Sequence, residues 1–243
     1  MPQALPYHET RPKVMAGIPC HNTQSSIGNV VSTARKYVDQ VIVVDDGSYD
    51  GTAEVAKAAG ALVVSHGVNR GYGEAVRACF ETAKTNGADI LVTIDGDGQH
   101  NPEEIPLLLA PILNREADVV VGSRFLTNKT NMPRYRKFGI NVITFLFNLG
   151  SKTKVSDAQS GFRAYSKEII ETCLLSEEGM SVSIEILEQA RRKGAIIKEV
   201  PISCAYSPSI LNPAVIRHGL SVALSVARIR FKHQFFGGTN RNE

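Results

Sequence analysis

Two carboxylates and one amide follow an apolar run in the middle of the chain. Asp95 and Asp97 are separated by Gly96, and Gln99 comes two residues later, after the run Leu91 to Ile94. In an extended or tightly turning segment, residues two positions apart point the same way. Asp95 and Asp97 would therefore offer oxygens to one hard cation, with Gln99 as a neutral third ligand, and Mg²⁺ or Mn²⁺ prefers such oxygens. A solvated turn would have the same pattern, so the segment alone leaves both interpretations open.

A second acidic pair ends another apolar run earlier in the chain. Asp45 and Asp46 follow Val41 to Val44, a run typical of a strand buried on both faces. A carboxylate in this place would accept hydrogen bonds from the base or ribose of a nucleotide. The alternative is a simple turn with a helix cap at Ser48 or Asp50.

Polar, charged or glycine-bearing loops follow five predicted strands and indicate one shared pocket, because ligands of open parallel sheets bind beyond the carboxyl ends of the strands. Besides the two acidic segments, these loops are Pro19-Cys20-His21-Asn22, His66 to Gly73 and Gly122-Ser123-Arg124. Arg124 would meet a phosphate with its planar guanidinium, although that segment alone is more often a strand exit with a surface arginine.

Other candidate motifs are weaker. Gly71-Tyr72-Gly73 matches the dinucleotide-binding fingerprint only in part, because Val76 stands where the third glycine belongs. These glycines more simply let the backbone approach a ligand or a neighbouring helix. The histidines are too dispersed to predict a metal site, and the cysteines have no visible histidine partner.

The elements that must position these residues alternate between short apolar strands and helices. Alternation of this kind predicts an α/β fold with a mostly parallel central sheet flanked by helices. The predicted strands cover 14–18, stopped by Pro19, and 41–44, 61–65, 90–94, 118–122, 160–166 and 195–200. The predicted helices cover 27–38, 52–59, 71–86, 103–114, 132–152 and 181–193, with a last helix over 214–236 as a C-terminal helical appendage.

Composition limits the class of protein. The chain has 243 residues, of which 43% are hydrophobic, and this is enough to bury the core of one large domain or of two small ones. A net charge of +3 is too weak to predict a nucleic-acid partner. The four scattered cysteines fit reduced, structural thiols, and the polar start of the chain does not resemble a signal peptide. Because no apolar run reaches about 18 residues, we expect a protein that is soluble or lies on a membrane without crossing it.

The motifs resemble glycosyltransferase family 2 of the GT-A fold. The resemblance rests on Val43 to Thr52 together with Asp95-Gly96-Asp97-Gly98-Gln99-His100. Within that family, Asp97 to Glu103, Gly122-Ser123-Arg124-Phe125 and Ser160-Gly161-Phe162-Arg163-Ala164-Tyr165 are similar to polyprenyl or dolichyl phosphate sugar synthases. The resemblance covers roughly 13–202. It implies a single domain over 1–243, with a nucleotide and metal half over about 13–125 and an acceptor and membrane-facing half over about 126–236.

The resemblance also implies roles for individual residues. Asp95, Asp97 and Gln99 would coordinate Mg²⁺ or Mn²⁺ on the donor diphosphate, with Asp97 and Arg124 as the catalytic pair. Nucleotide contacts would come from Pro19, His21, Asn22, Asp45, Asp46, Gly73 and Asp95. Contacts to the acceptor phosphate would come from Arg124, Arg134, Arg136, Ser160 and Arg163, and Asp157 falls in the same acceptor-side part of the family pattern.

The implied reaction moves a sugar from a UDP- or GDP-sugar to a lipid phosphate such as dolichyl phosphate, with inversion at the anomeric carbon. An ionised phosphate attacks without a general base, which agrees with the absence of a convincing base in the sequence. The alternatives are a family 2 transferase that elongates a glycan on a hydroxyl acceptor, for which Glu178 or Glu185 would be the base, and a noncatalytic nucleotide-sugar-binding module.

A lipid acceptor requires a membrane surface, and the helix over 132–152 has the broad apolar face and basic flanks of a helix in the headgroup plane. We therefore expect a cytoplasmic protein, peripheral on the cytoplasmic face of a membrane. A helix buried in the core or in a dimer remains the alternative, and the oligomeric state is left open. After Glu199-Val200-Pro201-Ile202 the basic residue of mannose-transferring members is displaced to Arg217 or His218. GDP-mannose, UDP-glucose and UDP-N-acetylglucosamine stay open as donors, with a slight preference for a UDP-sugar.

Overall fold

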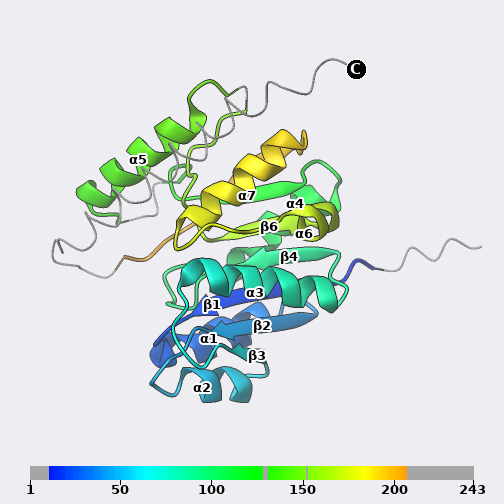
Figure 1. Ribbon diagram of the computed structural model, residues 1–243, viewed down its shortest axis with the longest axis vertical. Coiled ribbons are helices and arrows are strands. Elements are labelled where there is room, and N and C mark those ends of the chain that lie inside the picture. The colour runs from blue at the N-terminus through cyan, green and yellow to red at the C-terminus, as the bar shows by residue number, and fades with distance from the viewer. Residues whose placement is uncertain (1–10, 128–130, 152, 207–243) are drawn as a thin grey trace, which may run out of the picture.

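The computed structural model describes residues 11–127, 131–151 and 153–206, which form a seven-stranded sheet with helices on both faces (Figure 1). The spatial order of the strands is β3-β2-β1-β4-β6-β5-β7. The strands are β1 (Val14–Cys20), β2 (Gln40–Asp45), β3 (Leu62–Ser65), β4 (Ile90–Thr93), β5 (Val119–Ser123), β6 (Arg163–Ser166) and β7 (Ile197–Pro201). The helices are α1 (Gln24–Ala34), α2 (Thr52–Ala58), α3 (Tyr72–Thr85), the short 3-10 turn η1 (Pro102–Glu104), α4 (Ile105–Leu113), α5 (Arg134–Asn148), α6 (Lys167–Thr172) and α7 (Ser181–Arg192).

Strand direction confirms the predicted mostly parallel sheet. Strands β1 to β4 pair in parallel, β6 runs antiparallel to both β4 and β5, and β5 and β7 are parallel. Because β6 reverses direction between β4 and β5, those two neighbours point the same way. The carboxyl ends of β1 to β5 therefore lie along one edge of the sheet, where ligands of α/β proteins bind.

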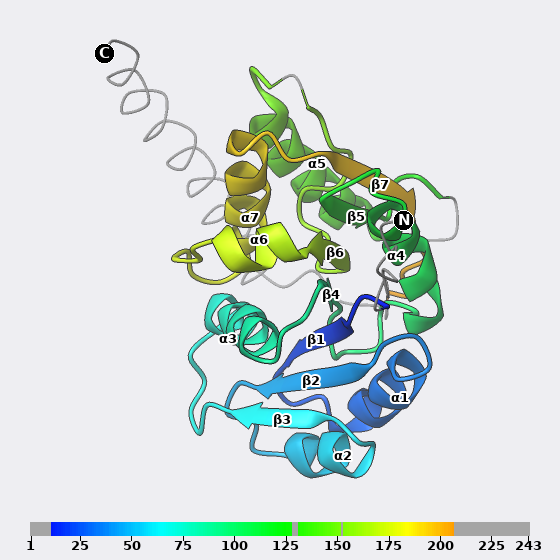
Figure 2. The ribbon, with the colours of Figure 1, turned by 90° about the vertical axis from the view of Figure 1, so that its right-hand side faces the viewer.

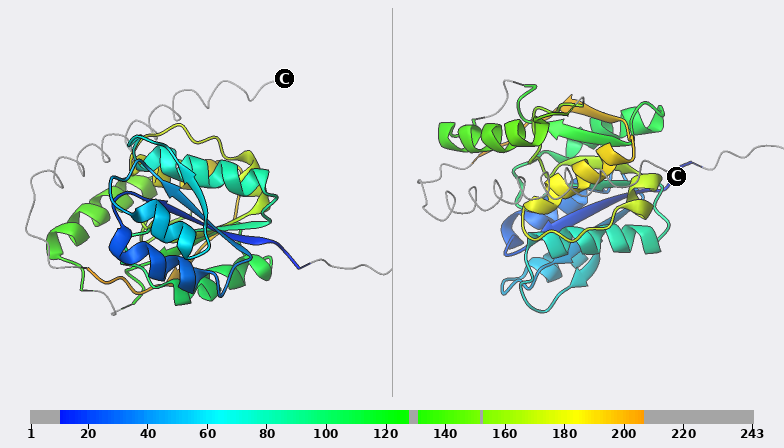
Figure 3. Two further views of the ribbon diagram at one scale, coloured as in Figure 1. Left: turned by 90° about the horizontal axis from the view of Figure 1, so that it is seen from below. Right: turned by 45° about the horizontal axis from the view of Figure 1, so that its top comes forward.

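Helices cover both faces of the sheet (Figures 2 and 3), and the sheet separates two hydrophobic cores. Helices α3, α5, α6 and α7 contribute buried side chains to one core, and α1, α2 and α4 contribute to the other. Alternation along β1 supplies both, since Met15 faces the first core and Ala16 the second. Burial on both faces explains why these strands are continuous apolar runs in the sequence.

The prediction that Pro19 stops the first strand is wrong, since β1 runs on to Cys20. The ladder between β1 and β4 ends at Gly17 and Thr93. Pro19 lacks an N–H, but it comes after the last residue of β1 that pairs with β4, so no hydrogen bond to β4 is lost. On the other side of β1, Pro19 lies in register with Val44 of β2.

Helix α5 lies at the margin of the described fold (Figures 1 and 3) and has two apolar faces. The inner face buries Ile140, Ile143 and Phe147. The outer face leaves Phe138 72% and Phe145 65% exposed, with Val142 and Leu149 on the same side. In the described part of the chain, no helix combines the length and the hydropathy that crossing a membrane requires. The helix predicted over 214–236, together with Arg217 and His218, lies outside the described residues.

Candidate functional site

Loops at the carboxyl ends of the strands surround a cavity of about 480 Å³. Most of the predicted site residues line this cavity: Pro19, His21, Asp46, Asp95, Asp97, Gln99, Arg124 and Arg136. Tyr72, Ile140, Met180 and Tyr206 also line it, and the sequence did not indicate them as site residues. The other predicted residues lie behind the walls or outside the cavity: Asn22, Asp45, Gly73, Arg134, Ser160 and Arg163.

Asp95 and Asp97 follow β4 and face the same cavity. Asp95 accepts a hydrogen bond from Tyr72 Oη on Oδ1 (3.0 Å), and its Oδ2 lies 3.8 Å from Nε2 of the buried His100. Asp97 accepts from the backbone N–H of Gln99 (2.9 Å). Desolvation raises the pKa of both carboxyl groups, and the charge of Asp95 raises the pKa of Asp97 further.

Gly161 gives the Asp95 carboxylate its room. A Cβ at position 161 would lie 2.6 Å from Oδ2 of Asp95 and 2.9 Å from Oη of Tyr72. Any side chain larger than hydrogen would thus displace one of these two groups. Gly161 immediately precedes the Phe162-Arg163 entry into β6, which pairs with β4.

Asp46 uses its carboxylate to hold the loop after β3. The oxygens accept from Nδ1 of His66 (2.8 Å) and from the backbone N–H groups of Arg70 (2.9 Å) and Gly71 (2.7 Å). Burial alone would raise the pKa of Asp46, but the hydrogen bonds from His66 and the two N–H groups outweigh it, and the pKa lies below its usual value. Asp45, next to it, accepts from Ser48 N (3.1 Å) and Ser65 Oγ (3.4 Å).

A tight turn after Asp46 makes this arrangement possible. Gly47 has a φ of +70°, and a Cβ there would lie 2.3 Å from the backbone carbon of Val68. The turn is joined to the loop after β1, since Asn22 N donates to Ser48 Oγ (2.9 Å) and Asn22 Oδ1 accepts from Tyr49 N (3.1 Å). Asn22 thus supports the pocket wall from behind.

Gly73 also has a role in packing, because the backbone of the 177–179 loop approaches it closely. A Cβ at Gly73 would lie 2.5 Å from the carbonyl oxygen of Glu177 and 3.0 Å from the N of Gly179. Gly73 therefore allows contact between α3 and the 177–179 loop, and its contact with a nucleotide stays a prediction.

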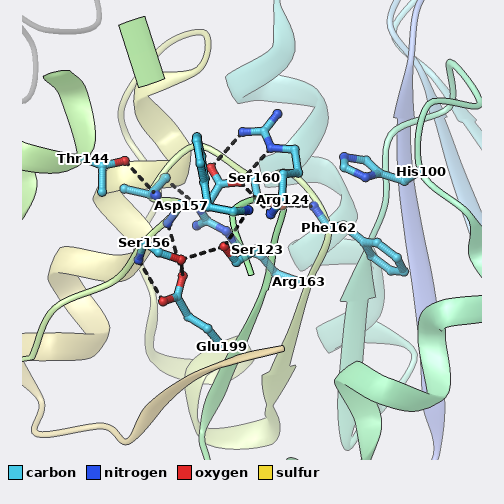
Figure 4. Close-up of polar contacts among 12 residues, drawn as sticks. His100, Ser123, Arg124, Thr144, Ser156, Asp157, Ser160, Phe162, Arg163 and Glu199 are labelled. Carbon is cyan, nitrogen blue, oxygen red and sulfur yellow. Dashed lines mark hydrogen bonds and ion pairs between the residues drawn. The ribbon is translucent and has the colours of Figure 1, made fainter. Parts of the chain in front are cut away.

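Arg124 also lines the cavity, and Figure 4 shows its polar contacts. Its Nε and Nη2 donate to Oδ2 and Oδ1 of Asp157 (2.6 and 2.8 Å), and its Nη1 donates to Oη of Tyr206 (3.0 Å). The side chain of Arg124 is 11% exposed and that of Asp157 is fully buried. Burial would lower the pKa of Arg124, but the Asp157 carboxylate outweighs it and raises that pKa. Arg136 lines the same cavity from α5, whereas Arg134 is exposed outside it.

A second, half-buried carboxylate supports the segment of Asp157. Glu199 of β7 accepts from Ser156 N (2.8 Å), Ser156 Oγ (3.0 Å) and Asp157 N (3.1 Å), as Figure 4 shows. Ser156 Oγ also lies 2.6 Å from Ser123 Oγ, at the end of β5. Burial raises the pKa of Glu199, and the hydrogen bonds from residues 156 and 157 oppose this effect.

Arg163 and Ser160 lie in the interior, 1% and 0% exposed. Arg163 donates to the carbonyl oxygens of Ser183 (2.6 Å) and Ala158 (2.7 Å). Neither residue lines the cavity, and Arg163 holds the loop that carries Asp157; direct phosphate contacts from Ser160 and Arg163 stay a prediction.

Comparison with known proteins agrees with this geometry. Residues 16–174 match the family described as glycosyl transferase family 2. UDP-N-acetylglucosamine–dolichyl-phosphate N-acetylglucosaminyltransferase of Methanococcus voltae is 34% identical over 214 residues, covering 78% of this chain and 84% of the relative. Polyprenol monophosphomannose synthase of Mycolicibacterium smegmatis is 32% identical over 203 residues, covering 76% of this chain and 75% of the relative.

A solved structure shares the fold. Glucosyl-3-phosphoglycerate synthase from Mycobacterium tuberculosis, in complex with Mn²⁺ and UDP-glucose, superposes with a TM-score of 0.71 at 25% identity, covering 89% of this chain and 78% of that one. The family match spans well over half of the sequence and includes both acidic pairs and Arg124. The chain therefore belongs to glycosyltransferase family 2 and has the GT-A fold of that family.

Proposed function

We propose that this protein transfers a sugar from a nucleotide-diphosphate sugar to the phosphate of a polyprenyl lipid such as dolichyl phosphate. The observation that carries the proposal is that the carboxylates Asp95 and Asp97 and the arginines Arg124 and Arg136 line one cavity. The carboxylates suit a cation with a diphosphate, and the arginines suit an anionic acceptor. The named activities of the Methanococcus and Mycolicibacterium relatives support this acceptor class.

A divalent metal ion, Mg²⁺ or Mn²⁺, fits the acidic side. The two carboxylates of Asp95 and Asp97 are hard oxygen donors in one cavity. Desolvation raises the pKa of both, and the charge of Asp95 raises that of Asp97 further, so a cation would stabilise the ionised pair. Gln99 would add a neutral oxygen. Among the described residues no group of three or more His, Cys, Asp or Glu could hold a metal, so donor phosphates and water would complete the coordination, as is usual for Mg²⁺. When bound, the ion stabilises the charge of the departing diphosphate.

The nucleotide would lie against Pro19, His21 and the loop that Asp46 holds. Asn22, Asp45 and Gly73 would act there by shaping the walls. We favour a UDP-sugar as donor, in keeping with the UDP-glucose bound by the Mycobacterium tuberculosis enzyme and the donor named for the Methanococcus relative.

The acceptor phosphate would lie against Arg124 and Arg136. A phosphate oxygen attacks the anomeric carbon, the bond from that carbon to the diphosphate breaks, and the nucleoside diphosphate leaves, with inversion. An ionised phosphate has no proton to lose, so this chemistry depends on alignment and charge neutralisation. The arginines would relieve the repulsion between the acceptor phosphate and the donor diphosphate.

The hydroxyl-acceptor alternative requires a catalytic base, and the positions of the two candidate bases, Glu178 and Glu185, argue against it. Glu185 accepts from Ser176 N, Ser176 Oγ and Glu177 N (2.6 to 3.0 Å), so it is committed to holding that loop. Glu178 does not line the cavity.

The lipid chain would approach along the exposed face of α5. Phe138 and Phe145 on this face are large apolar side chains in water, and Arg134 and Lys137 are exposed beside them. A helix of this kind binds in the headgroup region of a bilayer. We propose a peripheral position on the cytoplasmic face of a membrane.

The experiment is transfer by purified protein from a panel of radiolabelled donors, with Mg²⁺ or Mn²⁺, to dolichyl phosphate in detergent. The panel holds UDP-N-acetylglucosamine, UDP-glucose and GDP-mannose. A lipid product formed from one donor supports the proposal and identifies the sugar. Transfer only to glycan hydroxyls would overturn it, and nucleotide binding with no transfer from any donor would favour a noncatalytic module.

A further inference from the structure

Tyr206 contacts both arginines of the proposed phosphate wall. Its Oη accepts a hydrogen bond from Nη1 of Arg124 (3.0 Å), and its ring lies 5.5 Å from the guanidinium carbon of Arg136. The residue is 6% exposed and lines the cavity. One side chain thus joins a cation from the end of β5 to a cation from α5, two elements that approach the site from different directions.

The backbone of Tyr206 is fixed from two sides. Asn131 donates from Nδ2 to the carbonyl oxygen of Tyr206 (3.0 Å) and accepts from its N–H on Oδ1 (2.9 Å). The preceding residue, Ala205, donates its N–H to the carbonyl oxygen of Gln99 (2.8 Å), and the backbone of Cys204 forms an isolated antiparallel β-bridge with that of His100. The segment that carries Tyr206 is therefore anchored directly to the loop with the proposed metal ligands.

The contacts leave Arg124 able to bind an anion. A guanidinium has five N–H donors. In the described structure Asp157 accepts two of them and Tyr206 accepts one, so two remain for a ligand. The Arg124–Asp157 pair has no net charge, and the net positive charge of the wall comes from Arg136.

We propose that Tyr206 is a positioning residue that sets the spacing between Arg124 and Arg136, and so makes the two arginines a clamp for a phosphate monoester. The proposal rests on the proposed function, because the acceptor phosphate is the ligand. The hydroxyl orients the donors of Arg124, and the aromatic face holds the guanidinium of Arg136 by a cation–π contact. Tyr206 itself need not touch the reacting atoms.

Two substitutions separate the two contacts. Tyr206→Phe removes the hydrogen bond to Arg124 and keeps the ring beside Arg136. Tyr206→Leu removes both. The matched control is Tyr37→Phe, because Tyr37 is a half-buried tyrosine that packs on the core beneath α1, α2 and α4, outside the cavity. Thermal unfolding of each variant shows whether it is folded, and the isosteric Phe variant keeps the test valid if the Leu variant unfolds.

The first readout compares the KM for dolichyl phosphate with the KM for the nucleotide-sugar in the transfer reaction. We expect Tyr206→Phe to raise the KM for dolichyl phosphate roughly three- to tenfold, which lies within the net contribution of one typical hydrogen bond. The KM for the nucleotide-sugar should stay within about twofold of wild type, and Tyr206→Leu should raise the acceptor KM further. An equal rise in both KM values, or a loss confined to kcat, would indicate a general structural role and overturn the proposal.

The second readout is equilibrium binding of a short-chain, water-soluble prenyl monophosphate, measured by calorimetry without a donor. Weaker binding to Tyr206→Phe than to wild type supports the clamp even if the wild-type protein transfers no sugar to lipid phosphate, in which case only the proposed function fails. Equal binding by wild type and Tyr206→Phe overturns the clamp while transfer remains a separate result. No binding of the prenyl monophosphate by the wild-type protein would overturn both.

Discussion

Replacing Asp157 by asparagine tests whether Arg124 is a buried cation held by one carboxylate. The substitution keeps the shape of the side chain, removes its charge, and places an amide N–H₂ where one oxygen met the guanidinium. Arg124 would keep its charge with its side chain only 11% exposed. In the wild-type protein, Nε and Nη2 of Arg124 donate to the Asp157 carboxylate at 2.6 and 2.8 Å, and the backbone N–H of Arg124 donates to the same carboxylate at 3.2 Å.

The expected cost follows from this geometry. Removing one partner of a buried, well-formed ion pair leaves the other charge uncompensated and costs about 3–5 kcal/mol. For a domain of this size that cost lowers the melting temperature by roughly 6–20 °C. Removing both charges in Arg124→Met/Asp157→Leu should cost less than Asp157→Asn alone, because no isolated charge remains in the interior.

The assay is urea-induced unfolding at pH 7, followed by far-ultraviolet circular dichroism, for Asp157→Asn and for the double variant. The matched control is Glu116→Gln, which breaks the ion pair of Glu116 with Lys198 (2.8 Å) at the surface. That pair is exposed, so its loss should leave the unfolding midpoint almost unchanged. If Asp157→Asn were no more destabilising than Glu116→Gln, or if the double variant were the least stable, the reasoning would be refuted.

Three further predictions concern Asp97, Asp95 and Asp46, the carboxylates that line the cavity. Asp97→Ala should abolish sugar transfer without changing the circular dichroism spectrum, because the Asp97 side chain bonds within its own loop, to the N–H of Gln99; undiminished turnover would contradict its assigned role. Gly161→Ala should weaken Mn²⁺ binding in a direct titration, since the added Cβ would lie 2.6 Å from Oδ2 of Asp95, and Gly139→Ala is the control because a Cβ there meets no atom within 4 Å. The lowered pKa of Asp46 means that its carboxylate stabilises the fold above its ordinary pKa and that this stability is lost as pH falls through the folded value. Wild-type stability should therefore decline below about pH 4 more steeply than that of Asp46→Asn, in urea unfolding at a series of pH values; parallel curves would count against the hydrogen bonds described for it.

Much of the fold could be predicted because its strands are buried on both faces. A continuous apolar run as short as Val41 to Val44, bounded by polar residues, has the length of a strand and is too short for a buried helix. Helix α6 could not be predicted, since its six residues bury only Ile169 and Ile170 and show too little periodicity. The reversed direction of β6 was also hidden, because direction depends on the path of the connection and not on the residues of the strand.

The lateral packing of α5 shows a similar limit. The sequence predicts one broad apolar surface on this helix, but it cannot divide that surface into a face against the core and a face toward the outside. The fold assigns Ile143 and Phe147 to the core and leaves Phe138 and Phe145 exposed. The division depends on which residues of the neighbouring elements are present, and that is tertiary information.

The walls of the site divide in the same way. The position of Asp95 and Arg124 at strand ends could be predicted because the carboxyl ends of parallel strands share an edge. Tyr206 could not, since it enters the site only through the pairing of the segment after β7 with residues 99–100 and with Asn131. Asp157 lies in the part of the sequence that resembles the family, but the sequence does not show which residue it contacts, because Arg124 is 33 residues away along the chain.

The two acidic pairs have almost the same local sequence pattern and different surroundings, and this difference separates their roles. Strand β3 ends beside β2, so the loop that follows brings two backbone N–H groups and His66 to Asp46, and these donors lower its pKa. Asp95 has one phenolic donor from Tyr72 and faces Asp97, so desolvation dominates and the pKa values of Asp95 and Asp97 rise. A carboxylate already satisfied by backbone donors holds a loop in place. A pair of carboxylates with few donors, facing one cavity, is stabilised by an added cation, and for that reason we assign the metal to Asp95 and Asp97 and not to the pair that follows β2.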